Sequence, residues 1–136
     1  MKNAIKVKVT SDFWLNRQRR IKEEMIPYQW EIINDLRTIE IAQTGGDMNK
    51  FDSEKSYVVN NFKVAAGLIK GERRGMVFQD SDAYKWLEAA AYTLADFEDP
   101  DLEEKADSLI DLIGKAQQDD GYLNTYFTVN EPDRKY

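Results

Sequence analysis

The feature that most restricts the fold of this 136-residue chain is the spacing of its apolar residues, which recur every three or four positions over long stretches. Such a period places apolar side chains along one face of an α-helix, whereas a strand requires an alternation of period two. The pattern predicts about five helices, over residues 12–25, 27–36, 53–70, 82–97 and 99–117. We therefore expect a mainly α fold.

Two prolines indicate where helices begin. Pro27 fits the first turn of a second helix, because the N–H that proline lacks is not needed there. However, the apolar stripe that contains Ile21 and Met25 continues across Pro27, so one helix kinked at the proline is equally consistent with the sequence. Asp99 is expected to be the N-cap of the last helix, with Pro100 as its first residue.

Both ends of the chain carry patterns that are typical of strands. Residues 4–10 alternate strictly between apolar and polar side chains, which predicts a short N-terminal β-strand, and a second candidate lies within 122–130. A lone strand leaves backbone groups unpaired, and the predicted helix over 82–97 has large apolar residues on more than one face. We therefore expect an oligomer or a longer chain to supply partners for these elements.

The composition excludes several classes of site and partner. The chain has no cysteine and no histidine, which excludes disulfides, a thiolate nucleophile, a Cys/His zinc site and a histidine base. A net charge of −6 with scattered basic residues argues against nucleic-acid binding. No stretch reaches the roughly 18 apolar residues of a membrane helix, and the start lacks the apolar segment of a signal peptide. We expect a cytoplasmic protein with no nucleic-acid or membrane partner.

Several polar residues are candidates for chemistry, and each also has a structural interpretation. The stretch "KAQQDDGYLNTYF" (115–127) ends a helix with more hydrogen-bonding groups than a helix stop requires. Its Asp119 and Asp120 could pair with Asp80 as glycosidase acid and base, although "DDG" is also ordinary turn chemistry. Asp80 and Asp82 are either metal ligands or, as we favour, acidic residues of which one caps a helix. Nearby aromatic residues could stack on a sugar or belong to the core: Phe78, Tyr84, Trp86, Tyr122, Tyr126 and Phe127.

Three segments together resemble the N-terminal part of glycoside hydrolase family 127, the β-L-arabinofuranosidases. They are "SDFWLNRQRRIKEEMIPYQW" (11–30), "GMVFQDSDAYKWLEAAAYTLA" (75–95) and "LIDLIGKAQQDDGYLNTYF" (109–127), and "NNFKVAAG" (60–67) fits between them. Their order and rough spacing match the family over nearly the whole chain.

The resemblance implies a protein several times longer, with an (α/α)₆ barrel catalytic domain followed by β-sandwich domains. Residues 11–136 would be the N-terminal portion of that barrel, and the strand at 1–10 would join a β-sandwich. The family removes terminal β-L-arabinofuranose from plant glycans by a retaining mechanism. It uses a cysteine nucleophile held on a zinc ion by cysteines and a glutamate, with a second glutamate as acid/base.

None of those catalytic groups can be carried over to this chain, which lacks cysteine. We therefore expect no catalytic residue, metal ligand or cofactor in this chain. The resemblance implies that the full-length proteins of the family bind zinc. The resemblance implies that this chain lines part of the sugar pocket, with these substrate-binding residues: Phe78, Gln79, Asp80, Gln118, Asp120 and Tyr122.

The expected partners are an arabinose-containing oligosaccharide and either the remainder of the catalytic domain or another copy of the chain. We expect inward helix faces around Trp86 and Leu87 to be exposed without that cover, so the isolated chain should self-associate. The alternative function is that of a small non-catalytic helical protein that binds a glycan or another partner. A third hypothesis is a self-sufficient glycosidase that uses the Asp80 and Asp120 carboxylates.

Overall fold

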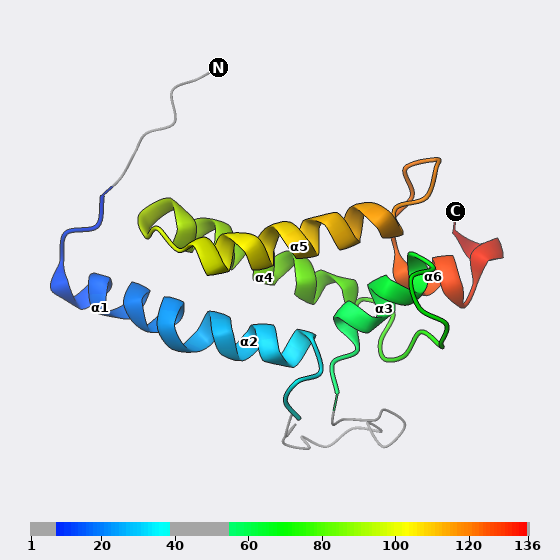
Figure 1. The fold of residues 1–136 in the computed structure, drawn as a ribbon, viewed down its shortest axis with the longest axis horizontal. Helices are drawn as coiled ribbons and strands as arrows, with labels where there is room; N and C mark the ends of the chain where they lie inside the picture. Colours follow the sequence, from blue (N-terminus) through cyan, green and yellow to red (C-terminus); the bar gives the residue numbers. More distant parts are fainter. Residues whose placement is uncertain (1–7, 39–54, 136) are drawn as a thin grey trace.

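The computed structural model describes residues 8–38 and 55–135, and within these ranges the fold is helical, as expected. The helices are α1 (Asp12–Arg20), a π-helical turn η1 (Ile21–Met25), α2 (Ile26–Ile33), α3 (Val58–Ala65), α4 (Asp80–Asp96), α5 (Pro100–Ala116), α6 (Thr125–Val129) and the 3₁₀ turn η3 (Pro132–Arg134). Figure 1 shows α1, η1 and α2 as one long helical rod beside the antiparallel pair α4 and α5. The shorter helices α3 and α6 lie at the end of this pair where α4 begins and α5 ends.

The strand predictions fare differently from the helix predictions. Most of the predicted strand at 4–10 lies outside the described residues, and residues 8–10, which are described, form no strand. The strand predicted within 122–130 is wrong, because Thr125–Val129 is the short helix α6. Asn124 starts this helix by accepting a hydrogen bond from the Phe127 N–H at 3.1 Å. An N-cap asparagine therefore outweighs the β propensity of the aromatic residues that follow.

The structure resolves the ambiguity at Pro27 in favour of one continuous helical rod. A proline inside a helix removes one N–H, and its ring clashes with the carbonyl of the residue four positions earlier. Here the π-helical turn Ile21–Met25 ends two residues before Pro27, and the Ile26 N–H bonds to the Ile21 carbonyl, five residues back. This wider turn is one of the known ways to accommodate an irregularity within a helix.

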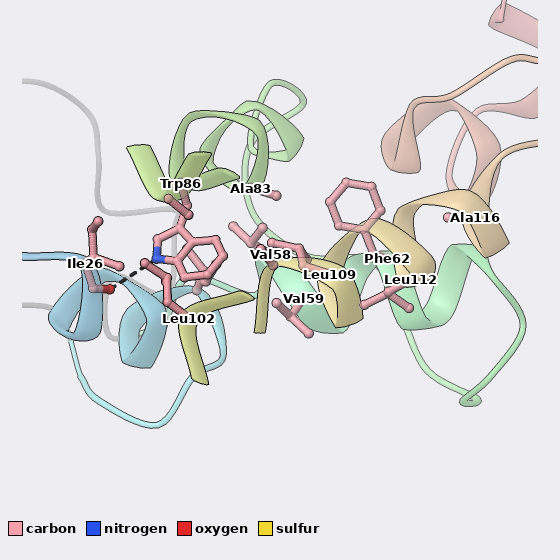
Figure 2. Packing of buried hydrophobic residues seen from close by; sticks show 13 residues of the cluster. Ile26, Val58, Val59, Phe62, Ala83, Trp86, Leu102, Leu109, Leu112 and Ala116 are labelled. Carbon is pink, nitrogen blue, oxygen red and sulfur yellow. Dashed lines mark hydrogen bonds between the residues drawn. The ribbon is translucent and has the colours of Figure 1, made fainter. Parts of the chain in front are cut away.

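The core lies between α2, α3, α4 and α5, and Figure 2 shows Trp86 of α4 at one end of it, beside Ile26 and Leu102. Trp86 is 2% exposed, packs against Trp30 at 4.6 Å between ring centroids, and donates its indole N–H to the Ile26 carbonyl at 3.1 Å. The expectation that Trp86 lies on an exposed face is therefore wrong. Leu87 is half-buried and packs against the same core. The rod α1–α2 covers this face, which accounts for the burial of Trp86.

Asp99 caps α5, as predicted, and also joins the helix to the rod. Its carboxylate accepts a hydrogen bond from the Leu102 N–H at 3.1 Å and pairs with the Lys22 ammonium at 2.9 Å. Pro100 is the first residue of the helix. Gln18 of α1 donates to Asp96 of α4, which is a second polar contact between the rod and the helix pair.

None of the helices in residues 8–38 and 55–135 combines the length and apolar character needed to cross a membrane.

The Asp99 contacts predict a pH-dependent stability. The hydrogen bond from Lys22, followed by that from the Leu102 N–H, lowers the pKa of Asp99. A carboxyl whose pKa is lower in the folded state stabilises the protein above its unfolded pKa of about 4, and this contribution is lost as the pH falls through the folded pKa. Asp99→Asn should therefore be less stable than the unsubstituted chain at pH 6, with the difference shrinking towards pH 3.

Urea unfolding at both pH values measures this difference. Asparagine is itself a good N-cap, so Asp99→Asn isolates the ionic contribution, whereas Asp99→Ala also loses the cap and should cost about 1 kcal/mol in the free energy of unfolding. A stability difference between Asp99→Asn and the unsubstituted chain that is the same at pH 6 and pH 3 would contradict the prediction.

Candidate functional site

The candidate site lies at the end of the molecule where α4 begins and α5 ends. Because these two helices are antiparallel, the loop before α4 and the loop after α5 come to the same end of the pair (Figure 1). The first loop, residues 66–79, contains Phe78 and Gln79, and the second, residues 117–124, contains Gln118, Asp120 and Tyr122.

The last part of the first loop, residues 71–79, is fixed by side chains that bond to its backbone. The Asn61 carboxamide of α3 is fully buried, donates to the Arg74 carbonyl at 2.8 Å and accepts from the Arg74 N–H at 3.0 Å. Arg73 donates to the Gly75 carbonyl at 2.7 Å and also to the Met76 carbonyl. Saturating buried backbone groups in this way holds a loop as firmly as regular secondary structure does.

Gln79 completes this arrangement and has no polar atom left over. Its carboxamide accepts from the Met76 N–H at 2.9 Å and donates to the Ser56 carbonyl. Phe78, by contrast, is 64% exposed at the end of the fixed loop. The loop therefore presents an aromatic ring to its surroundings on a rigid backbone, which is the arrangement that favours a binding contact at low entropic cost.

Gly75 is the position in this loop where a side chain would displace Gln79. Its φ is +80°, and a Cβ atom placed there would lie 1.9 Å from Gln79 Oε1. Gly75→Ala should therefore cost more than 2 kcal/mol in the free energy of unfolding, about 1 kcal/mol for the left-handed backbone and the rest for displacing Gln79. Thermal unfolding monitored by circular dichroism measures this loss.

Gly67 provides the matched control for that prediction. Its φ is +67°, but a Cβ atom there would meet nothing within 4 Å. Gly67→Ala should therefore show the backbone cost alone, about 1 kcal/mol. Equal losses in the two variants would mean that the contact between Gly75 and Gln79 has no role in holding the loop.

Asp80 joins the start of α4 to Thr125, the first residue of α6. It is 4% exposed, and its two carboxylate oxygens accept from the Thr125 N–H at 2.7 Å and the Thr125 hydroxyl at 2.6 Å. Asp80 is the first residue of α4, and neither it nor Asp82 makes a side-chain capping bond to the helix, so that expectation is wrong. The carboxylate bonds to Thr125 instead because α6 is packed against the start of α4.

Arg73 is the buried cation of the site, and sequence inspection did not identify it. It is 4% exposed, its Nε donates to the Thr125 hydroxyl at 3.3 Å, and its guanidinium lies 5.2 Å from the centre of the Tyr126 ring. Burial lowers the pKa of Arg73, opposed by the charge of Asp80. Burial, with a smaller effect from Asp80, raises the pKa of Tyr84 to about 12, so its hydroxyl stays protonated at neutral pH.

The second loop is a tight turn. Gly121, at φ +87°, donates to the Gln118 carbonyl at 2.8 Å, and the Gln118 N–H donates to the Tyr122 carbonyl at 2.9 Å. Asp120 is exposed and accepts from the Tyr122 N–H at 2.9 Å, which is ordinary turn geometry for aspartate. The Lys135 ammonium lies 5.6 Å from the centre of the half-buried Tyr122 ring.

The aromatic candidates divide between core and surface. Trp86 is in the core, whereas Phe78 is exposed and Tyr84 is 39% exposed with its ring 6.1 Å from that of Phe62. Tyr126 and Phe127 are half-buried and pack edge-to-face at 5.2 Å, with the Tyr126 hydroxyl donating to Glu131 at 2.6 Å. Phe78 is therefore the candidate ring with the greatest accessible surface.

Comparisons with known proteins identify the family. Residues 6–136 match the sequence profile of the β-L-arabinofuranosidase GH127 catalytic domain. The chain is 50% identical over 126 residues to a non-reducing end β-L-arabinofuranosidase of Bifidobacterium longum, covering 90% of this chain and 18% of that protein. Its fold is similar to the crystal structure of Ara127N-Se, a GH127 β-L-arabinofuranosidase from Geobacillus stearothermophilus T6. That similarity has a TM-score of 0.82 at 45% identity and covers 97% of this chain and 19% of the other.

The chain thus spans about a fifth of the length of these relatives. The profile match extends over nearly every residue, and the likeness in fold agrees with a mainly helical part of an α/α barrel. The chain belongs to the β-L-arabinofuranosidase family GH127, and it corresponds to part of that family's catalytic domain.

Proposed function

We propose that this chain forms part of the sugar-pocket wall of a glycosidase that removes terminal β-L-arabinofuranose, or a related sugar, from plant glycans by a retaining mechanism. Residues 11–136 are then the first portion of an (α/α)₆ barrel, with residues 1–10 contributing a strand to a β-sandwich elsewhere in the longer protein. Family membership supports the substrate class. The observation that carries the pocket role is the fixed loop 71–79, which presents the exposed ring of Phe78.

The six predicted substrate-binding residues have different roles in this proposal. Phe78 and Tyr122 offer aromatic surfaces, which pack on the apolar faces of sugars, and Gln118 and Asp120 provide polar groups at the exposed turn. The Gln79 carboxamide hydrogen-bonds to Met76 and Ser56, and the Asp80 carboxylate hydrogen-bonds to Thr125. In this proposal Gln79 and Asp80 hold the backbone of the loops in place, and the sugar contacts are made by Phe78, Tyr122, Gln118 and Asp120.

The described residues do not fit the zinc site that the family resemblance implies. In the ranges 8–38 and 55–135 no three carboxylate, cysteine or histidine side chains gather closely enough to hold a metal ion. The chain also has no cysteine or histidine anywhere in its sequence. The proposal therefore assigns no catalytic step to this chain, and it places the nucleophile, the acid/base and the zinc ligands in the remainder of the longer protein.

The proposal is tested by assaying the 136-residue chain beside the polypeptide that the source cells make, whose intact mass is measured first. We expect a heavier native product that hydrolyses a chromogenic β-L-arabinofuranoside and contains zinc, and a 136-residue chain that does neither. Phe78→Ala in the active polypeptide should raise KM. Hydrolysis by the short chain in the presence of a chelator would favour the two-carboxylate hypothesis instead.

The outer face of α1–α2 supports the proposed contact with the remainder of the catalytic domain. Its apolar side chains are between 43% and 57% exposed: Phe13, Trp14, Ile21, Met25 and Tyr28. A contiguous apolar stripe of this kind is covered by protein in most folded molecules. This chain spans about a fifth of its relatives' length, so the remainder of the longer polypeptide is the proposed cover.

The uncovered stripe predicts self-association of the isolated 136-residue chain. Light scattering should show a mass that rises with concentration, and the double variant Ile21→Lys/Met25→Glu should shift the chain towards monomer, because both side chains are exposed on the stripe. Leu36→Lys is the control, since Leu36 is 72% exposed beyond the end of α2. A monomer at every concentration that binds no apolar dye would contradict the prediction.

A further inference from the structure

The site contains a buried anion and a buried cation that do not touch directly. Asp80 and Arg73 are each 4% exposed, and the hydroxyl of Thr125 lies between them. Thr125 is itself 1% exposed. Buried charges are costly unless they are paired and hydrogen-bonded, so three such residues in one network indicate a constraint on this part of the fold.

The bridging atom must donate and accept at the same time. The Thr125 hydroxyl donates its one hydrogen to Asp80 Oδ1 at 2.6 Å and accepts from Arg73 Nε at 3.3 Å. Among neutral side chains of this size, only serine and threonine have an oxygen with both capacities. The Thr125 N–H donates to the second carboxylate oxygen of Asp80 at 2.7 Å, so both oxygens of Asp80 bond to one residue.

The network joins the loop and helix start at residues 73–80 to Thr125, which lies 45 residues beyond Asp80. Arg73 holds the carbonyls of Gly75 and Met76 in the loop that presents Phe78. Asp80 is the first residue of α4, and Thr125 is the first residue of α6, directly after the turn that contains Tyr122. The guanidinium of Arg73 also lies over the Tyr126 ring at 5.2 Å. A change at Thr125 is therefore transmitted to both loops.

We propose that Asp80, Thr125 and Arg73 form a positioning network that sets the loop carrying Phe78 relative to the turn carrying Tyr122. Asp80 then acts on the sugar only through Thr125, as a positioning residue, and does not touch the substrate. This inference rests on the proposed function, because it assumes that the two loops bind sugar. A binding group displaced by a fraction of an ångström weakens binding measurably, which is why such loops need a fixed reference point.

The test compares Thr125→Val with Thr125→Ser in the natural polypeptide that contains this chain. Valine preserves the shape of threonine but removes the hydroxyl, while serine retains it. With a chromogenic β-L-arabinofuranoside, we expect Thr125→Val to raise KM roughly fivefold or more while kcat changes less, and Thr125→Ser to remain within about twofold of the unsubstituted protein. Arg73→Lys, which keeps the cation and every contact of Asp80 with Thr125 but removes the Nε–H that bonds to the Thr125 hydroxyl, serves as a second variant in case Thr125→Val does not fold.

The alternative, in which Asp80 binds sugar directly, predicts a different pattern. Asp80→Asn would then reduce kcat/KM strongly, while Thr125→Val and Arg73→Lys would leave KM unchanged. A KM within about twofold of the unsubstituted value for both of these variants, or for whichever of them folds, overturns the positioning network. A large rise in KM for Thr125→Ser would also overturn it, because serine keeps the bridging hydroxyl.

Hydrogen exchange separates failure of this inference from failure of the proposed function. If the network holds the loops, Thr125→Val accelerates amide exchange in segments 71–79 and 118–127 at least severalfold and leaves the centre of α5 unchanged. Unchanged exchange in these segments overturns the inference. Accelerated exchange together with an unchanged KM in Phe78→Ala would keep the network and reject the sugar-binding role of the loop.

Discussion

Replacing Trp86 with alanine should lower the free energy of unfolding by about 3–5 kcal/mol, as is typical when a buried large aromatic side chain is removed. Trp86 is 2% exposed, and Figure 2 shows it beside Ile26 of the rod and Leu102 of α5. Its ring packs on Trp30 at 4.6 Å, and its indole N–H bonds to the Ile26 carbonyl at 3.1 Å. The substitution therefore leaves a cavity and also removes the donor of a buried hydrogen bond.

Urea unfolding followed by far-ultraviolet circular dichroism measures this loss without relying on the substituted tryptophan as the reporter. Tyr92→Ala is the matched control, because Tyr92 is a large aromatic residue on the same helix and is 70% exposed. Surface substitutions of this kind usually cost within about 0.5 kcal/mol. Equal losses for Tyr92→Ala and Trp86→Ala would mean that the rod does not pack on α4 as described.

The sequence predicts α4 and α5 well because their signals are local. Asp99 and Pro100 define the start of α5 through a cap and a proline that act within one turn, and Gly121 ends the turn that follows. Most of the apolar stripe of α5 lies on its buried face, including Leu102 and Leu109, whereas Ile110 is 54% exposed. Signals of this kind depend on neighbours within four residues, so periodicity and capping chemistry suffice to find them.

The burial of Trp86 and the helical state of 125–129 depend on contacts that the sequence does not reveal. Trp86 is covered by Ile26 and Trp30, which lie 60 and 56 positions earlier in the chain. Thr125 is the first residue of α6, and its N–H donates a hydrogen bond to Asp80, 45 residues earlier in the chain. Periodicity indicates that a face is apolar, but it does not indicate which other element covers that face.

In the candidate site, too, the sequence indicated residues with local signals and missed those whose roles depend on distant contacts. The family resemblance selected Asp80 as a sugar-binding residue, but the structure bonds its carboxylate to Thr125, which gave no signal in the sequence. Inspection of the sequence also missed Asn61 and Arg73, which hold the loop 71–79. In "GERRG" two adjacent arginines look alike, and only the fold buries Arg73 and exposes Arg74.

That difference between adjacent arginines gives the second large prediction. Arg73→Met should cost about 3–5 kcal/mol in the free energy of unfolding, because removing one partner of a buried ionic network leaves the other charge uncompensated. Asp80 would keep Thr125 as a donor but lose the cation, and the carbonyls of Gly75 and Met76 would lose their donors. Methionine approximates the length and apolar stem of arginine, so the loss reports mainly on charge and hydrogen bonding.

Arg74→Met controls for the chemistry of the substitution at a neighbouring position. The Arg74 side chain is 57% exposed and lies 3.8 Å from Glu72, so its loss should cost about 1 kcal/mol or less. The double variant Arg73→Met/Asp80→Asn completes the cycle in urea unfolding. It should be more stable than the sum of the two single losses predicts, because it leaves neither a buried cation nor a buried anion without its partner. Strict additivity would mean that Arg73 and Asp80 do not interact through Thr125, and it would remove the energetic basis for the positioning network.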